Sequence, residues 1–118
     1  MQIDKLNTTN LKLSREVSPA EPLWKRLPMQ NEEGKNLSDF MMIIPKLKHQ
    51  STDKIKNIIN EIDQVLRYYE KQVVFADLNL NLNVLWISVQ PIAGICLEVA
   101  AAIHHRVPEA KLVASKLD

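Results

Sequence analysis

Two hydrophobic patterns follow one another in the first half of the chain. Residues 40–44 form a continuous apolar run that ends at a proline, which is typical of a strand covered on both faces. Apolar side chains then recur at helical spacing from Ile55 to Tyr69, after polar residues at 51–53 that can cap a helix. These patterns predict a strand within residues 38–47, followed by an amphipathic helix.

A strict alternation of apolar and polar residues comes next. The leucines within 78–82 are even-numbered, whereas the apolar residues from Leu85 to Val89 are odd-numbered. A turn or bulge must intervene if both sets face one core, and the asparagines between them tolerate the backbone of a turn. We predict two antiparallel strands, about 72–80 and 83–90, joined by a short hairpin. A single long bent strand is the alternative.

The last third of the chain predicts one more helix and one more strand. Apolar residues recur at helical spacing between Ile92 and Val107, and Pro108 ends the pattern. A weak alternation at 110–115 predicts a short final strand. The resulting order, βαββαβ, is that of the ferredoxin-like α+β architecture, in which a four-stranded antiparallel sheet carries both helices on one face.

Residues 1–36 differ in composition from the rest of the chain. They contain few apolar residues, three prolines and a polar run at their end, which together disfavour regular structure. We therefore predict a flexible, irregular N-terminal arm at 1–36 and a ferredoxin-like domain at 37–118. Within the arm, Trp24 with Leu23 and Leu27 forms a candidate docking anchor for this domain or for a partner. The alternative is a solvent-exposed tryptophan.

Helices on one face leave the other face of the predicted sheet open. If the odd-numbered residues of the strand at 83–90 face the helices, the apolar residues expected on the open face are Trp86, Phe75, Val73, Val84 and Val113. Monomers seldom expose an apolar patch of this size, so we expect a cover. A second copy of the chain is the first expectation, since isologous pairs are the commonest soluble assemblies. The arm with Trp24 and an unrelated protein are alternatives, and with reversed strand faces Trp86 would belong to the core.

Composition and charge argue against nucleic acid as a partner. The 15 basic and 14 acidic residues give a net charge of +1, which provides no electrostatic attraction for nucleic acid or for an anionic membrane. A four-stranded sheet with exposed aromatic residues also serves RNA-recognition domains, but residues 82–89 lack the basic residue, the glycines and the paired aromatics of their motif. With two glycines in the sequence, no glycine-rich loop can hold a phosphate.

Neither a membrane segment nor a metal or cofactor site is expected. The longest apolar tract, at 92–103, contains Glu98 and is too short to span a bilayer, and the N-terminus lacks the apolar stretch of a signal peptide. The single cysteine, Cys96, permits no intramolecular disulfide and no thiolate cluster. We therefore expect a cytoplasmic protein without a bound metal or cofactor.

Three residues of the second predicted helix are capable of chemistry. Cys96 lies in the apolar stripe, which predicts a core position, and His104 is about 12 Å further along the axis, too far to activate the thiol. The side chains of His104 and His105 diverge by about 100° on a helix, so the two cannot hold a metal together. Near a helix C-terminus they interact favourably with the helix dipole. A ligand-facing or pH-sensitive contact is the alternative.

Lys46, Lys48 and His49 concentrate basic groups where the first strand meets the first helix. Backbone N–H groups and the helix dipole at this end would favour a small anion. These residues are therefore a candidate anionic-ligand site, and the alternative is that lysines beside a turn serve solubility.

No arrangement of residues in the sequence predicts a catalytic site. We therefore expect a small, non-catalytic cytoplasmic module for interaction or ligand sensing, homodimeric, which binds a protein partner or a small anionic ligand. Regulatory domains that bind ligands share this topology. The alternative is a small enzyme whose site forms at the subunit interface from a carboxylate and one of the histidines His49, His104 and His105.

Overall fold

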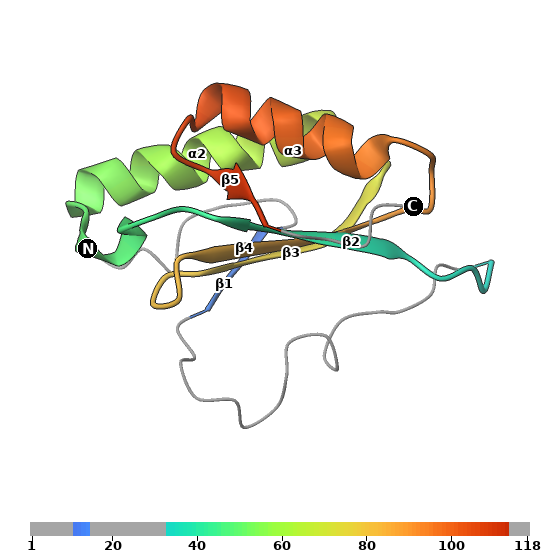
Figure 1. Ribbon diagram of the computed structural model, residues 1–118, viewed down its shortest axis with the longest axis horizontal. Coiled ribbons are helices and arrows are strands. Elements are labelled where there is room, and N and C mark those ends of the chain that lie inside the picture. Colours follow the sequence, from blue (N-terminus) through green and yellow to red (C-terminus); the bar gives the residue numbers. More distant parts are fainter. Residues whose placement is uncertain (1–10, 15–32, 114–118) are drawn as a thin grey trace.

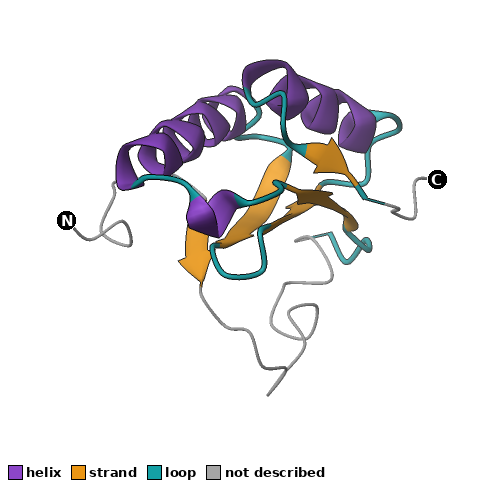
Figure 2. Ribbon diagram, turned by 60° about the vertical axis from the view of Figure 1, so that its left-hand side comes forward, coloured by secondary structure: helices purple, strands orange, loops and turns teal. Residues whose placement is uncertain are grey.

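Two helices lie over one face of a five-stranded mixed sheet in the computed structural model, which describes residues 11–14 and 33–113 (Figure 1). The elements in chain order are β1 (Leu11–Ser14), β2 (Ser38–Ile43), the short 3-10 helix η2 (Leu47–His49), α2 (Thr52–Tyr68), β3 (Val73–Asn79), β4 (Val84–Val89), α3 (Ile95–Arg106) and β5 (Lys111–Leu112). The strand order across the sheet is β1-β3-β4-β2-β5. Figure 2 shows both helices on the same side of the strands, so the fold is α+β, as predicted.

The sheet differs from the predicted one in the number and direction of its strands. The pairs β2–β4, β3–β4 and β2–β5 are antiparallel, whereas β1 runs parallel to β3, so the prediction of a four-stranded antiparallel sheet is wrong. The additional strand comes from the stretch predicted to be irregular. Leu11 and Leu13 alternate with Lys12 and Ser14, and Leu11 is only 5% exposed. Trp24, the predicted docking anchor of this stretch, lies outside the described residues.

The helix α2 forms as its apolar spacing predicts. Ser51 Oγ caps its N-terminus by accepting a hydrogen bond from Lys54 N at 3.2 Å. The apolar side chains that it buries are Ile55, Ile58, Ile59, Ile62, Val65 and Leu66. The second helix, α3, begins directly after Gly94, whose φ of 80° suits glycine. Each helix thus starts at a residue that is suited to that position.

The β3–β4 hairpin confirms two strands rather than one long bent strand. Asn79 Oδ1 at the end of β3 accepts hydrogen bonds from the backbone N–H groups of Asn81 at 3.0 Å and Leu82 at 2.9 Å. Asn83 has a φ of 61°, a left-handed conformation that asparagine tolerates. Asparagines therefore form this turn without a glycine.

A bulge at Val74 changes which residues of β3 face the helices. Val73 pairs with Val89, whereas Phe75 pairs with Ser88, so that Val74 is one extra residue between the two pairs. Val89 belongs to the core, and Val73 is 4% exposed within the same core. The expectation that Val73 lies on the open face with Phe75 is therefore wrong, because strict alternation fails across a bulge.

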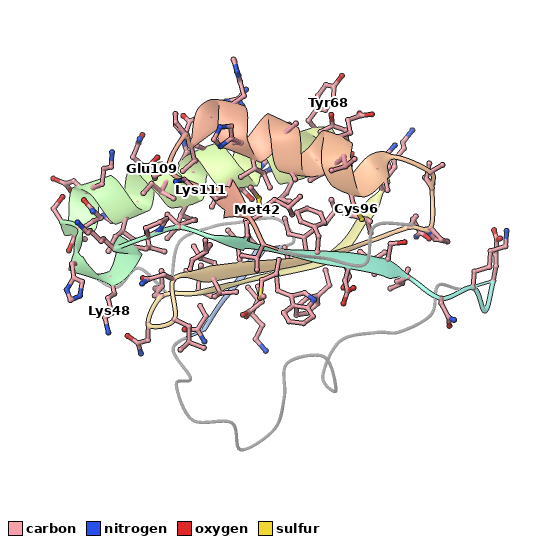
Figure 3. The ribbon with its side chains drawn as sticks, in the orientation of Figure 1. Met42, Lys48, Tyr68, Cys96, Glu109 and Lys111 are labelled. Carbon is pink, nitrogen blue, oxygen red and sulfur yellow. The ribbon has the colours of Figure 1, made fainter. Side chains whose placement is uncertain are left out.

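The core fills the layer between the sheet and the helices. Met42 of β2 and Cys96 of α3 lie in this layer (Figure 3) and are 1% and 7% exposed. Phe40, Leu85 and Ile87 belong to the same buried cluster. Since side chains alternate along a strand, the residues between them point to the opposite face of the sheet.

Candidate interaction surface

The sheet surface turned away from α2 and α3 is called the open face below. Strand pairing places its residues in rows across the sheet. The central row consists of Lys12, Asp77, Trp86, Met41 and Val113, the last of which donates its N–H to Met41 O at 2.9 Å. The rows on either side consist of Asn79, Val84, Ile43 and Lys111, and of Phe75, Ser88 and Asp39.

Six apolar residues lie on the open face, five of them in β2, β3 and β4 and one, Val113, directly after β5. Of the residues predicted there, Trp86, Phe75, Val84 and Val113 are on this face and partly buried, while their role in binding stays a prediction. Sequence reasoning missed two residues of β2, because the run 40–44 contains no polar residue that shows which side chains point outward. The pairing of β2 with β4 supplies this information. The apolar patch is therefore defined as Met41, Ile43, Phe75, Val84, Trp86 and Val113.

Three polar residues of the open face, Asp77, Asn79 and Ser88, are buried more deeply than the apolar patch. Asp77, between Lys12 and Trp86 in the central row, is 2% exposed, and Ser88 is 3% exposed. Trp86 Nε1 is also buried and has no hydrogen-bond partner among the described residues. A buried N–H without a partner costs free energy, so an acceptor oxygen that reached Trp86 Nε1 would be stabilising.

The basic residues between β2 and α2 lie on the surface. Lys46 has a φ of 62°, and the backbone N–H of Lys48 donates to Asn83 Oδ1 at 3.0 Å. Lys46, Lys48 and His49 are exposed, and Lys48 extends outward at this end of the molecule (Figure 3). Within the described part of the chain, no polar contact joins their side chains. The anionic-ligand site therefore stays a prediction, since no contacts among the described residues hold these side chains together.

His104 and His105 have different surroundings at the end of α3. His104 Nδ1 lies 2.7 Å from the carbonyl oxygen of Ala110. Because a carbonyl oxygen can only accept, Nδ1 carries the proton of this hydrogen bond. His105 is exposed, and neither histidine contacts a carboxylate in the residues that the structure describes. This hydrogen bond links the last turn of α3 to Ala110, the residue before β5.

The side chains of Cys96 and Tyr69 have raised pKa values. Burial raises the pKa of the Cys96 thiol, and the charge of Asp39 raises it further. Cys96 therefore carries less thiolate than an exposed cysteine, which suits packing rather than nucleophilic attack. A hydrogen bond to Glu98, followed by burial, raises the pKa of Tyr69. This bond joins the C-terminal end of α2 to the first turn of α3.

A cavity of about 370 Å³ lies between α2 and α3. Tyr68, which is 81% exposed, and the arginines at positions 67 and 106 line it. Arg67 Nε contacts Asp63 Oδ2 at 2.7 Å, and Arg106 Nη1 contacts Glu61 Oε2 at 3.1 Å, so both guanidinium groups are already paired. Such a groove depends on how two helices pack, and it leaves no signal in the sequence.

Comparisons of the chain with protein-family models, curated proteins and solved structures found no significant match. Among the described residues, no helix has the length and apolar character needed to cross a membrane. The same residues contain no group of three or more His, Cys, Asp or Glu side chains placed to hold a metal.

Proposed function

We propose that this chain is a non-catalytic interaction module that binds through the apolar patch and forms homodimers. The observation that carries the proposal is the position of Trp86 in the central row, beside Met41 and with a buried Nε1 that has no partner among the described residues. Tryptophans at the centre of an interface contribute a large share of binding free energy. In a two-fold dimer, each copy presents the same patch to the other.

The arrangement of the strands supports this use of the open face. We propose that β2, β3, β4 and β5 form a ferredoxin-like unit to which β1 is added at one edge. In support, these four strands pair antiparallel in the order β3-β4-β2-β5, with α2 and α3 on one face. A cytoplasmic location is part of the same proposal, supported by a sequence with a single cysteine.

The histidines give the alternative of an interface enzyme no support. The proton on His104 Nδ1 is held by Ala110 O, and His49 and His105 make no contact with a carboxylate in the described residues. The raised pKa of Cys96 also opposes a nucleophilic role. We therefore propose binding rather than catalysis.

Light scattering after size exclusion tests the proposal. With rising concentration, the mass of the full chain is expected to increase from the monomer value of 13.5 kDa toward that of a dimer. Ile43→Lys places a charge in the apolar patch and is expected to keep the mass at the monomer value. Ile92→Lys is the matched control, because Ile92 is 52% exposed and lies between β4 and α3, away from the open face. Equal self-association of the two variants, or an unchanged chain that stays monomeric throughout, would refute the dimer.

A further inference from the structure

The cavity between α2 and α3 is called the interhelical groove below. Its volume of about 370 Å³ is within the range of sites that hold small organic molecules, about 300–1,000 Å³. Tyr68, one of the residues that line it, lies on the helix layer and points away from the sheet (Figure 3). The groove is therefore separate from the apolar patch, and binding in it does not depend on the proposed dimer.

The two ion pairs beside the groove expose their cations more than their anions. The Asp63 side chain is 7% exposed, whereas the Arg67 side chain that pairs with it is 52% exposed. In the second pair, the Glu61 side chain is 28% exposed and the Arg106 side chain 43%. Both arginines line the groove, and no aspartate or glutamate of the described chain does so. A ligand that enters the groove therefore meets guanidinium groups rather than carboxylates.

The guanidinium groups keep hydrogen-bond donors that the ion pairs do not use. Arg67 donates through Nε to Asp63 Oδ2. Arg106 donates through Nη1 to Glu61 Oε2 and, at 2.7 Å, to Gln64 Oε1. Since a guanidinium carries N–H groups on all three of its nitrogens, each arginine has two nitrogens that make no hydrogen bond to the described residues. An oxygen anion can therefore bind here without breaking either ion pair.

Apolar and aromatic side chains form much of the remaining lining. Val65 and Ala102 contribute aliphatic surface. The rings of Tyr68 and Tyr69, which also line the groove, meet edge to face with their centroids 4.9 Å apart. Because Tyr68 is 81% exposed, a ligand packed against it would remove aromatic surface from water. An inorganic anion would leave this surface uncovered, so the lining favours an anion that carries an apolar group.

We propose that the interhelical groove binds a small organic carboxylate with an apolar body. The carboxylate accepts hydrogen bonds from Arg106 and Arg67, and the apolar body packs against Tyr68 and Ala102. A guanidinium matches a carboxylate with two parallel N–H···O bonds, and such charge-assisted bonds are about twice as strong as bonds between neutral groups. The chain thus carries a ligand site on its helix layer in addition to the proposed interface on its open face.

Titration of the full chain with benzoate, followed by nuclear magnetic resonance, tests the site. Benzoate joins a carboxylate to an aromatic ring, and it is expected to shift the backbone signals of Tyr68 and Ala102 until the site is saturated. Benzyl alcohol keeps the ring without the charge, and acetate keeps the charge without the ring. Each of these two compounds is expected to bind about tenfold more weakly than benzoate, because it makes only half of the contacts.

Two variants remove the site in different ways, and each has a matched control. Arg106→Gln removes a charge from the groove and is expected to weaken benzoate binding about tenfold. Lys48→Gln removes an exposed charge that precedes α2, far along the chain from the groove residues of this helix, and is expected to leave the affinity unchanged. Ala102→Phe fills the groove and is expected to abolish the benzoate shifts, whereas Ala101→Phe, at the exposed neighbouring position of α3, is expected to keep them. Circular dichroism identifies a variant that fails to fold, and the other variant then carries the test.

Several results would overturn the site. Equal affinities for benzoate and benzyl alcohol would show that the arginines do not recognise the carboxylate, and equal affinities for benzoate and acetate would show that the apolar lining contributes nothing. Equal binding by the Ala102→Phe and Ala101→Phe chains, or no saturable shift with benzoate, would exclude the groove. Binding that is lost in Lys48→Gln and kept in Arg106→Gln would assign the anion to the basic residues between β2 and α2. Light scattering without benzoate tests the dimer separately, so either proposal can fail alone.

Discussion

His104 Nδ1 lies 2.7 Å from the carbonyl oxygen of Ala110 and so ties the last turn of α3 to the residue that precedes β5. His104→Ala is expected to lower the free energy of unfolding by about 1 kcal/mol, because this hydrogen bond is lost. His105→Ala, at the exposed neighbouring position, is expected to change it by less than about 0.5 kcal/mol. Urea denaturation measures both, and equal effects would mean that the bond contributes nothing to stability.

Tyr69 is expected to make the fold less stable in alkaline solution. The hydrogen bond to Glu98, followed by burial, raises the pKa of Tyr69 above its ordinary value of 10.0, so the folded chain favours the neutral phenol. The resulting stabilisation is complete below the pKa of Tyr69 in the unfolded chain and is lost as pH rises through its higher pKa in the folded chain.

Phenolate absorbance measures this pKa in a Tyr68→Phe chain, where Tyr69 is the sole tyrosine. Adding Glu98→Gln is expected to lower the pKa of Tyr69, since the carboxylate is the main cause of the shift. If Glu98→Gln does not change the pKa of Tyr69, the Glu98 carboxylate does not form a hydrogen bond with the phenol.

Two substitutions of Asn83 are expected to differ in stability. Its backbone has a φ of 61°, and its Oδ1 accepts the N–H of Lys48 at 3.0 Å. Asn83→Gly keeps the backbone and loses this bond, whereas Asn83→Ala also strains the backbone and is expected to cost about 1 kcal/mol more. Thermal and urea unfolding measure the difference. An alanine variant as stable as the glycine variant would argue against a left-handed residue in this turn.

Leu11→Ala tests whether β1 belongs to the folded unit. Leu11 is 5% exposed in the core cluster, and removing a buried leucine side chain costs about 2–5 kcal/mol. Leu82→Ala is the control, because Leu82 is 49% exposed in the β3–β4 turn, and it is expected to cost less than about 0.5 kcal/mol. Chemical denaturation of both variants gives the comparison. Similar small costs would mean that β1 adds little to the fold.

Regular spacing made the helices and the hairpin predictable. The apolar residues of α2 recur with the period of a helix, so one face of it had to be buried. The change from even-numbered to odd-numbered apolar residues between Leu82 and Leu85 located the turn, because a strand of period two keeps one parity toward the core. Both signals are local and need no knowledge of the partner element.

The rest depends on contacts between distant segments. The segment with the two leucines of β1 forms a strand because it pairs with β3. The local sequence of β1 does not indicate which strand it pairs with. Val73 lies in the core and not on the open face, because of a bulge at Val74. No glycine in the sequence indicates this bulge. The bond from His104 to Ala110 exists because the chain turns back after α3. Dimer formation, an anionic ligand and a cytoplasmic location stay predictions.

The parallel pairing of β1 with β3 also sets an order of events on the ribosome. Leu11 lies opposite Ala76, which is synthesised about 65 residues later. At about 5–20 residues per second, translation needs about 3–13 s to reach it. During this interval the nascent chain carries the two leucines of β1 without a strand to receive them. β1, which is made before β3, can join the sheet only after β3 has emerged.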